Sequence, residues 1–286
     1  MKLTTRKFGV EIEVLRKSSM TDDEMFDEIV VNMTAAGLDV RNRGYTHSIT
    51  PYWKILTDAS CGLELVSPPL SGDAGLHEIE IACKVLTNLN YQVDKSTGLH
   101  VHHDARNLTR DQITGIFATA MKWETVMDHL VAPSRVNNRF CQSNAHRRPE
   151  TASYLNAELA SLRSTGAENF NMNGYDRYLK VNYQAYLRHG TIEFRQHQGT
   201  TEAAKIIHWV IVTQNLITRT LEHGVSWRAE SETAISFKRF RDMLGCSGIT
   251  LENNEYVKQA ARTMIERFRK FANGLTPYES ALGHNI

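Results

Sequence analysis

The stretch FGVEIEV, residues 8–14, places an apolar side chain at every second position. Alternation with a period of two predicts a β-strand that buries one face and leaves the other polar. Glu11 and Glu13 fall on the polar face, while the valine and isoleucine side chains fall on the opposite one. This stretch therefore predicts a sheet that is covered on one side only, as antiparallel sheets commonly are.

Other stretches repeat the pattern, with ionisable groups two positions apart between apolar residues. They are Glu64 in GLELV (62–66), His100 and His102 in LHVH (99–102), and Glu193, Arg195 and His197 in TIEFRQH (191–197). Residues two apart in a strand share a face and stand about 6.6 Å from each other. We expect all these side chains to lie on the face that carries Glu11 and Glu13.

Each pattern taken alone has an ordinary structural explanation, such as a solvated sheet face, a structural histidine or a cross-strand ion pair. Taken together they gather carboxylates, imidazoles and one guanidinium on a single face. Clustered carboxylates repel one another unless a positive charge lies between them, and hard divalent cations prefer oxygen ligands. Arg195 offers a planar fork for phosphate oxygens. If the strands are neighbours in one sheet, the sequence predicts a metal and nucleotide site there.

Helical periodicity follows most of the strands. We expect helices at 21–37, where Thr21 and Glu24 form a capping box, and at 73–89, 109–131, 202–222, 231–244 and 252–271. A hairpin is predicted from strands 178–187 and 191–196, and residues 132–176 are expected to contain a functional loop. The fold class is therefore α+β, an antiparallel sheet with helices packed on one face and an active site on the open, concave face.

The bulk composition excludes several classes of protein. The chain has 286 residues, and its 33 Lys and Arg balance 32 Asp and Glu, so no global field attracts nucleic acid. Four dispersed cysteines form no CxxC pair, which leaves zinc fingers and redox dithiols without support. The first twenty residues contain no apolar signal region, and no apolar run is long enough to span a membrane. We expect a cytoplasmic protein without a membrane partner.

Four motifs also carry a family resemblance. FGVEIE (8–13), TDASCGLELVSPPL (57–70), STGLHVHHD (96–104) and RYLKVNYQAYLRHGTIEFRQHQGT (177–200) stand in the order of the amidoligase family of phages and bacteria. That family is identified as a branch of the glutamine synthetase and glutamate–cysteine ligase superfamily, and the resemblance covers roughly residues 6–215. It implies a glutamine-synthetase-like sheet and an ATP- and Mg²⁺-dependent (or Mn²⁺-dependent) ligase that forms an amide through an acyl phosphate.

The resemblance also implies roles for individual residues. The implied metal ligands are Glu11, Glu13, Glu64, His100 and Glu193, and the implied catalytic residues are Arg195, Glu193 and His100. His102 would contact the nucleotide, and Arg195 would hold the transferring phosphate. Glutamine synthetase has further acidic ligands, for which this sequence shows no counterpart beyond Glu64, so the number of metal ions stays open.

Two further groups of residues have a functional and an ordinary interpretation. The segment 134–148 contains four arginines and no acidic residue; Arg135 and Arg139 could contact ATP phosphates, or the segment could be a solvated loop. Arg177 and Asn182 could orient a substrate carboxylate, or belong to a ladder of polar side chains. For domains, we expect a catalytic domain at 1–222 and a helical part at 223–286 packed on it.

The function predicted from the sequence is a carboxylate–amine ligase, and two alternatives stay open. One is a metal-dependent hydrolase, because similar side chains serve hydrolysis. The other is a nucleic-acid-binding module on a degenerate ligase fold, using the arginines of 134–148. The expected substrates are small-molecule, peptide or modified-base acids and amines, and the sequence leaves a homo-oligomer open.

Overall fold

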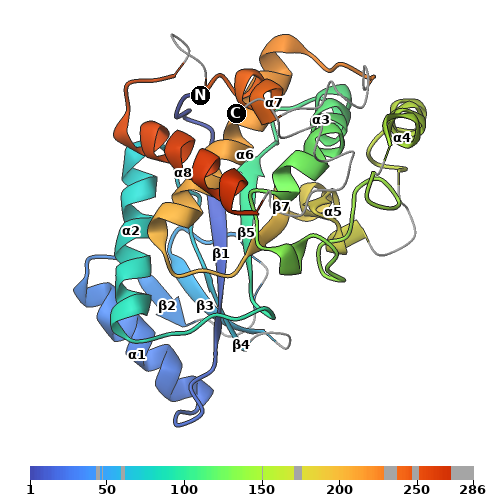
Figure 1. Cartoon of the computed structure of the whole chain (residues 1–286). Coiled ribbons are helices and arrows are strands. Elements are labelled where there is room, and N and C mark those ends of the chain that lie inside the picture. The colour runs from blue at the N-terminus through green and yellow to red at the C-terminus, as the bar shows by residue number, and fades with distance from the viewer. Residues whose placement is uncertain are drawn as a thin grey trace.

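A seven-stranded sheet forms the centre of the protein in the computed structural model (Figure 1). The model describes residues 1–42, 46, 48–58, 62–149, 151–170, 176–228, 237–246 and 251–271. The strands are β1 (Phe8–Leu15), β2 (Val40–Asn42), β3 (Trp53–Asp58), β4 (Gly62–Val66), β5 (Gly98–Asp104), β6 (Val181–Asn182) and β7 (Thr191–Gln198). Their order is β2-β3-β4-β1-β5-β7-β6, and every neighbouring pair is antiparallel except β2 and β3. The α+β fold class with an open, mainly antiparallel sheet is confirmed.

The helices account for most of the remaining described residues. They are α1 (Asp22–Ala35), α2 (Gly72–Asn88), α3 (Arg110–Asp128), α4 (Ala152–Thr165), α5 (Gln184–His189), α6 (Ala203–His223), α7 (Phe237–Met243) and α8 (Glu255–Phe271), with short 3₁₀ turns η1 (Pro133–Arg135) and η2 (Asp176–Tyr178). The expected capping box starts α1, where Thr21 accepts from the Glu24 amide and Glu24 accepts from the Thr21 amide. Among the described residues, no helix is long and apolar enough to cross a membrane.

The core lies between one face of the sheet and the helices. The alternating apolar residues of β1, Val10, Ile12 and Val14, are all buried in it. α6 packs against β5 and also contacts α2, α3 and α8, and Figure 1 shows α2, α6 and α8 over one face of the sheet. Side chains of α7 and α8, among them Phe240 and Phe268, belong to the same core cluster as the strand residues. The other face of the sheet is thereby left for the polar side chains.

The expected hairpin at 178–196 is only partly correct. β6 has two residues and pairs antiparallel with β7, but Gln184–His189 forms the helix α5, which ends at Gly190 with a positive φ of 67°. Residues 132–176 contain a helix, α4, that the loop prediction did not include. β2, a parallel edge strand, was also missed. Of the helix expected at 231–244, residues 231–236 lie outside the described part of the chain.

Candidate active site

Seven of the predicted site residues lie in three rows of paired residues that run across the open face of the sheet. Side chains directly opposite each other in neighbouring strands share a face. The first row is Lys54, Val66, Glu11 and His100; the second is Leu56, Glu64 and Glu13; the third is Gly9, His102, Glu193 and Asn182. The structure thus brings together, on neighbouring strands, the four carboxylates and two of the three histidines that the two-residue alternation predicted for one face.

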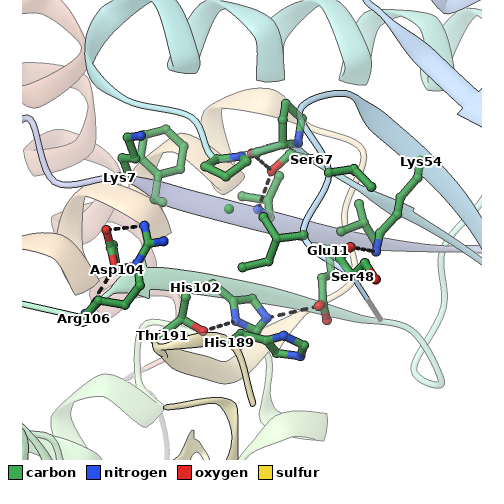
Figure 2. Close-up of a pocket in the computed structure, with 18 residues that line it drawn as sticks. Lys7, Glu11, Ser48, Lys54, Ser67, His102, Asp104, Arg106, His189 and Thr191 are labelled. Carbon is green, nitrogen blue, oxygen red and sulfur yellow. Dashed lines mark hydrogen bonds and ion pairs between the residues drawn. The ribbon is translucent and has the colours of Figure 1, made fainter. Parts of the chain in front are cut away.

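Glu11 is the centre of this arrangement. One of its oxygens, Oε2, lies 2.8 Å from His100 Nδ1, and the other, Oε1, lies 3.1 Å from His102 Nε2. His102 Nδ1 is in turn 2.9 Å from Thr191 Oγ1, so its ring lies between Thr191 and Glu11 (Figure 2). Burial alone would raise the pKa of Glu11, but the two histidines, His102 first, hold this pKa well below its usual value. Glu11 is therefore an anion in the buried cluster.

Glu193 forms the second anionic part of the cluster. Asn182 donates to its Oε2 at 2.6 Å, and Arg195 donates to its Oε1 at 2.5 Å. Burial opposes ionisation, but Arg195 and then His102 lower the pKa of this carboxyl, while nearby Glu11 acts in the other direction. Burial likewise opposes the charged form of His102, yet Glu11 and Glu193 raise its pKa. The cluster holds opposite charges in contact.

Two sets of donor atoms in this cluster are spaced to hold a cation. Glu11, Glu64 and His100 form one set, and Glu11, His102 and Glu193 form the other; within each, the ligand atoms lie within 4.8 Å of one another. Carboxylate oxygens and imidazole nitrogens suit a divalent cation, and three protein ligands leave positions for phosphate oxygens or water. Because Glu11 belongs to both sets, the donor chemistry fits either one cation or two that share this carboxylate.

Glu13 and His102 are placed differently from the roles that the resemblance implies. Glu13 Oε2 accepts from the Gly98 amide at 2.5 Å, and Glu13 Oε1 lies 3.5 Å from His100 Nε2. Glu13 therefore helps to position the His100 ring and belongs to neither donor set. His102 is a potential metal ligand in the second set. Alternation places several carboxylates and imidazoles on one face of the sheet, but their hydrogen bonds decide which of them point towards a common cation site.

Four arginines line the pocket above the cluster, which has a volume of about 390 Å³. They are Arg135, Arg177, Arg188 and Arg195. Arg188, at the end of α5, was missed because its segment was expected to form a hairpin turn. Arg177 lies in η2 and stacks on Tyr178, with 4.6 Å between its guanidinium carbon and the ring centre. A second site residue that was missed is Lys54, in β3.

Arg135 and Arg139, which the sequence paired as phosphate contacts, lie in different surroundings. Arg135 is only 2% exposed; one terminal nitrogen donates to the Arg195 carbonyl at 2.8 Å, and its Nε has no hydrogen-bond partner among the described residues. Arg139 is exposed, stacks on Phe140 and does not line the pocket. Arg135 is thus placed to support Arg195, and its unpaired Nε is an orphaned donor beside the pocket.

A β-bulge at residues 195–196 of β7 changes the face on which the following side chain lies. Val101 of β5 pairs with Phe194 and Leu99 pairs with His197, so two residues of β7 stand opposite one of β5. Arg195 stays on the site face, but His197 turns into the core, where its ring centre lies 5.5 Å from that of Trp209 on α6. The prediction that His197 continues the polar face is therefore wrong. Simple alternation cannot reveal a bulge.

Buried charges behind the bulge hold it in place. Lys180 donates to Glu124 at 3.0 Å and to Asp128 at 2.7 Å, both on α3, and all three side chains are buried. Gln196, next to Arg195, also donates to Asp128, at 2.6 Å. The Lys180 carbonyl accepts from the Arg195 amide at 2.8 Å. This network ties the backbone of Arg195 to α3.

Comparison with known proteins adds one finding to this geometry. No curated protein matches the sequence. A family model described as "Putative amidoligase enzyme" matches residues 4–217, which is well over half of the chain and includes every side chain of the cluster. The description of that family implies a ligase enzyme. Because the match covers well over half of the chain, and because the motifs on its strands agree with it, the chain belongs to the putative amidoligase family.

Proposed function

We propose that this protein is an ATP- and divalent-cation-dependent carboxylate–amine ligase, which forms an amide bond through an acyl phosphate. One observation carries the proposal: a carboxylate shared by two metal-competent sets, Glu11, lies in the same pocket as four arginines. Phosphoryl transfer needs this combination, since most of its catalysis is positioning and neutralisation of charge.

The reaction requires no protein nucleophile. A carboxylate oxygen of the acid attacks the γ-phosphorus of ATP, and the bond from that phosphorus to the bridging oxygen of ADP breaks. The amine nitrogen then attacks the acyl carbon, the carbon–oxygen bond to phosphate breaks, and the proton of the amine passes to the departing phosphate. A divalent cation held by either donor set would neutralise phosphate charge during the first step.

The residues of the chain have separable roles in this scheme. Arg195 would donate to the transferring phosphoryl group with the part of its guanidinium that Glu193 does not bind. Asn182 fixes the orientation of Glu193, because it donates to Oε2 and its own oxygen accepts from the Gln184 amide at 2.9 Å. His100 is fixed between Glu11 and Glu13.

The nucleic-acid alternative receives little support from the placement of the arginines in 134–148. Arg135 is buried at the pocket, Arg148 pairs with buried Asp128 at 2.9 Å, and Arg147 stacks on Tyr154. Together with Arg139 on Phe140, they contact different parts of the structure and form no single basic surface.

Trapping with hydroxylamine tests the proposal without knowledge of the natural amine. Hydroxylamine attacks an acyl phosphate to give a hydroxamate, so a panel of carboxylic acids with ATP and Mg²⁺ should give hydroxamate and ADP in equal amounts. ADP formation should need the acid. Hydrolysis of esters or amides without ATP would favour the metal-dependent hydrolase, and the absence of ADP with every acid would reject the ligase.

A further inference from the structure

A second pocket, of about 130 Å³, lies at the start of β1 (Figure 2). The two pockets share Glu11, Lys54, Val66, His102 and His189 as a common wall. A three-substrate reaction needs room for the nucleotide and for the group that it activates. The shared wall is where a bound carboxylate could reach the phosphate end of a nucleotide.

The walls of the second pocket are mainly apolar. They include Ile49, Val66, Pro68 and Pro69. Ile49 lines the pocket and is 54% exposed, so it lies where the pocket opens to solvent. The arginine here, Arg106, is bound by Asp104 through both carboxylate oxygens, at 2.8 Å each, so it differs from the arginines of the first pocket.

Gly9 creates the space at the floor of this pocket. It stands directly opposite His102 on the site face of β1. A Cβ atom at this position would meet only Ser67 Oγ, at 3.6 Å, which is an ordinary van der Waals contact. The backbone needs no glycine for a left-handed conformation, because Gly9 is not among the residues with positive φ. Its missing side chain is therefore space that a ligand can fill.

The charges around the pocket favour an acid over an amine. Both carboxylates that line the pocket already have partners: Arg106 pairs with Asp104, and His100 and His102 contact Glu11. The buried Lys54 ammonium donates to the Thr46 and Ser48 carbonyls at 2.9 and 2.8 Å, so its hydrogen bonds go to neutral groups; burial lowers its pKa, and the nearby Glu11 and Glu64 carboxylates favour its charged form. An approaching carboxylate is attracted by this charge.

We propose that the second pocket binds the apolar side chain of the carboxylic acid substrate, a branched aliphatic or small aromatic acid, and directs its carboxylate towards Lys54 and His102. The volume suits such a group, since an apolar cavity of about 150 Å³ holds one benzene ring. Because most of the surface of this pocket is apolar, an apolar side chain gains more from entering it than a polar or charged one does. The inference rests on the proposed ligase function, because it assigns the acid subsite of that reaction.

The test compares acids of graded size and polarity in the hydroxylamine assay. From propanoate to 4-methylpentanoate, kcat/KM should rise about fourfold for each methylene that enters the pocket. Glutarate, in which a second carboxylate takes the place of the terminal methyl group of pentanoate, should have a kcat/KM at least tenfold below that of pentanoate. Equal rates for these two acids would overturn the proposal.

Variants at Gly9 then locate the effect. Gly9→Val should lower kcat/KM for 4-methylpentanoate at least tenfold more than it lowers kcat/KM for acetate; for Gly9→Ala this difference should be smaller. The thermal midpoints of both variants serve as folding controls. A uniform loss for all acids, acetate included, would contradict a role for the pocket in side-chain binding.

A binding measurement separates this inference from the proposed function. Calorimetry of 4-methylpentanoate with the wild type and Gly9→Val needs no turnover. If no acid supports ADP formation but the wild type binds this acid and Gly9→Val does not, the ligase proposal fails and the apolar site stands. If the acid binds both proteins equally, the site assignment is wrong whatever the reaction.

Discussion

Replacement of Lys180 by methionine tests the buried network that holds the bulge of β7. Lys180 is 1% exposed, and its ammonium joins Glu124 and Asp128 across the interface between β6 and α3. Burial opposes the charged form, but Asp128 and then Glu124 raise the pKa of Lys180, so it remains a cation. Lys180→Met keeps a long apolar stem and removes only the charge and its donors.

The expected loss of stability depends on the hydrogen-bond partners that Asp128 and Glu124 keep in the Lys180→Met variant. Breaking a buried ion pair by removing one partner costs about 3–5 kcal/mol, because the other charge stays buried. Asp128 keeps Arg148 at 2.9 Å and Gln196 at 2.6 Å, and Glu124 keeps the Asn144 amide at 3.0 Å. The residual partners place the loss at the lower end, about 3 kcal/mol of a total stability of about 5–15 kcal/mol.

Urea unfolding followed by circular dichroism measures this loss, with Lys258→Met as the matched control. Lys258 in α8 pairs with Glu255 at 2.9 Å, but both side chains reach solvent, so the control should leave the unfolding midpoint unchanged. Because the Lys180 side chain anchors to α3 the backbone whose carbonyl accepts from the Arg195 amide, Lys180→Met should lower hydroxamate formation under folding conditions more than it lowers ATP affinity. Equal midpoints for Lys180→Met and Lys258→Met would refute the assigned network.

Three other predictions concern the site and the core. Glu193→Gln and Arg195→Lys should both fold cooperatively and lose about 10²–10³ in the rate of hydroxamate formation, since each removes one preorganised electrostatic contact; rates within a few-fold of wild type would make this strand structural. Arg139→Ala should leave the KM for ATP within about twofold, and a tenfold rise would place Arg139 in the site after all. Burial lowers the pKa of His208 to about 3, so its contribution to stability is full above pH 6.5 and declines as pH falls towards 3. At pH 5 the loss of stability is about 2 kcal/mol. His208→Leu should therefore reduce the shift in urea midpoint between pH 7.5 and pH 5, and an unchanged shift would contradict a neutral buried imidazole.

The sequence predicted the central part of the site because a strand enforces a simple geometry. A period of two decides which side chains share a face, so Glu11, Glu64, His100 and Glu193 could be assigned to one surface before their strands were known to be neighbours. The register then added what alternation cannot contain. It placed Glu11 opposite His100 and Glu193 opposite His102.

The features that were missed depend on long-range contacts. The bulge that turns His197 into the core arises from the pairing of β7 with β5 and from the buried network behind it. Lys54 stands between the apolar residues Trp53 and Ile55 of β3, so its local sequence does not mark it as a site residue. Only the fold shows that its ammonium donates to carbonyls of the loop beside the site. Arg188 lines the pocket from the end of helix α5, where the sequence predicted the turn of a hairpin.

The central claim is that the cluster around Glu11 binds a divalent cation together with ATP. Calorimetric titration of ATP into the protein, once with Mg²⁺ and once with excess chelator, tests it most directly. We predict that ATP binds with Mg²⁺, that binding is lost or strongly weakened in chelator, and that Glu11→Gln, which removes the shared carboxylate from both donor sets, abolishes the difference. Equally tight binding of ATP by the wild type with Mg²⁺ and with chelator would contradict the assignment of this cluster as a metal and nucleotide site.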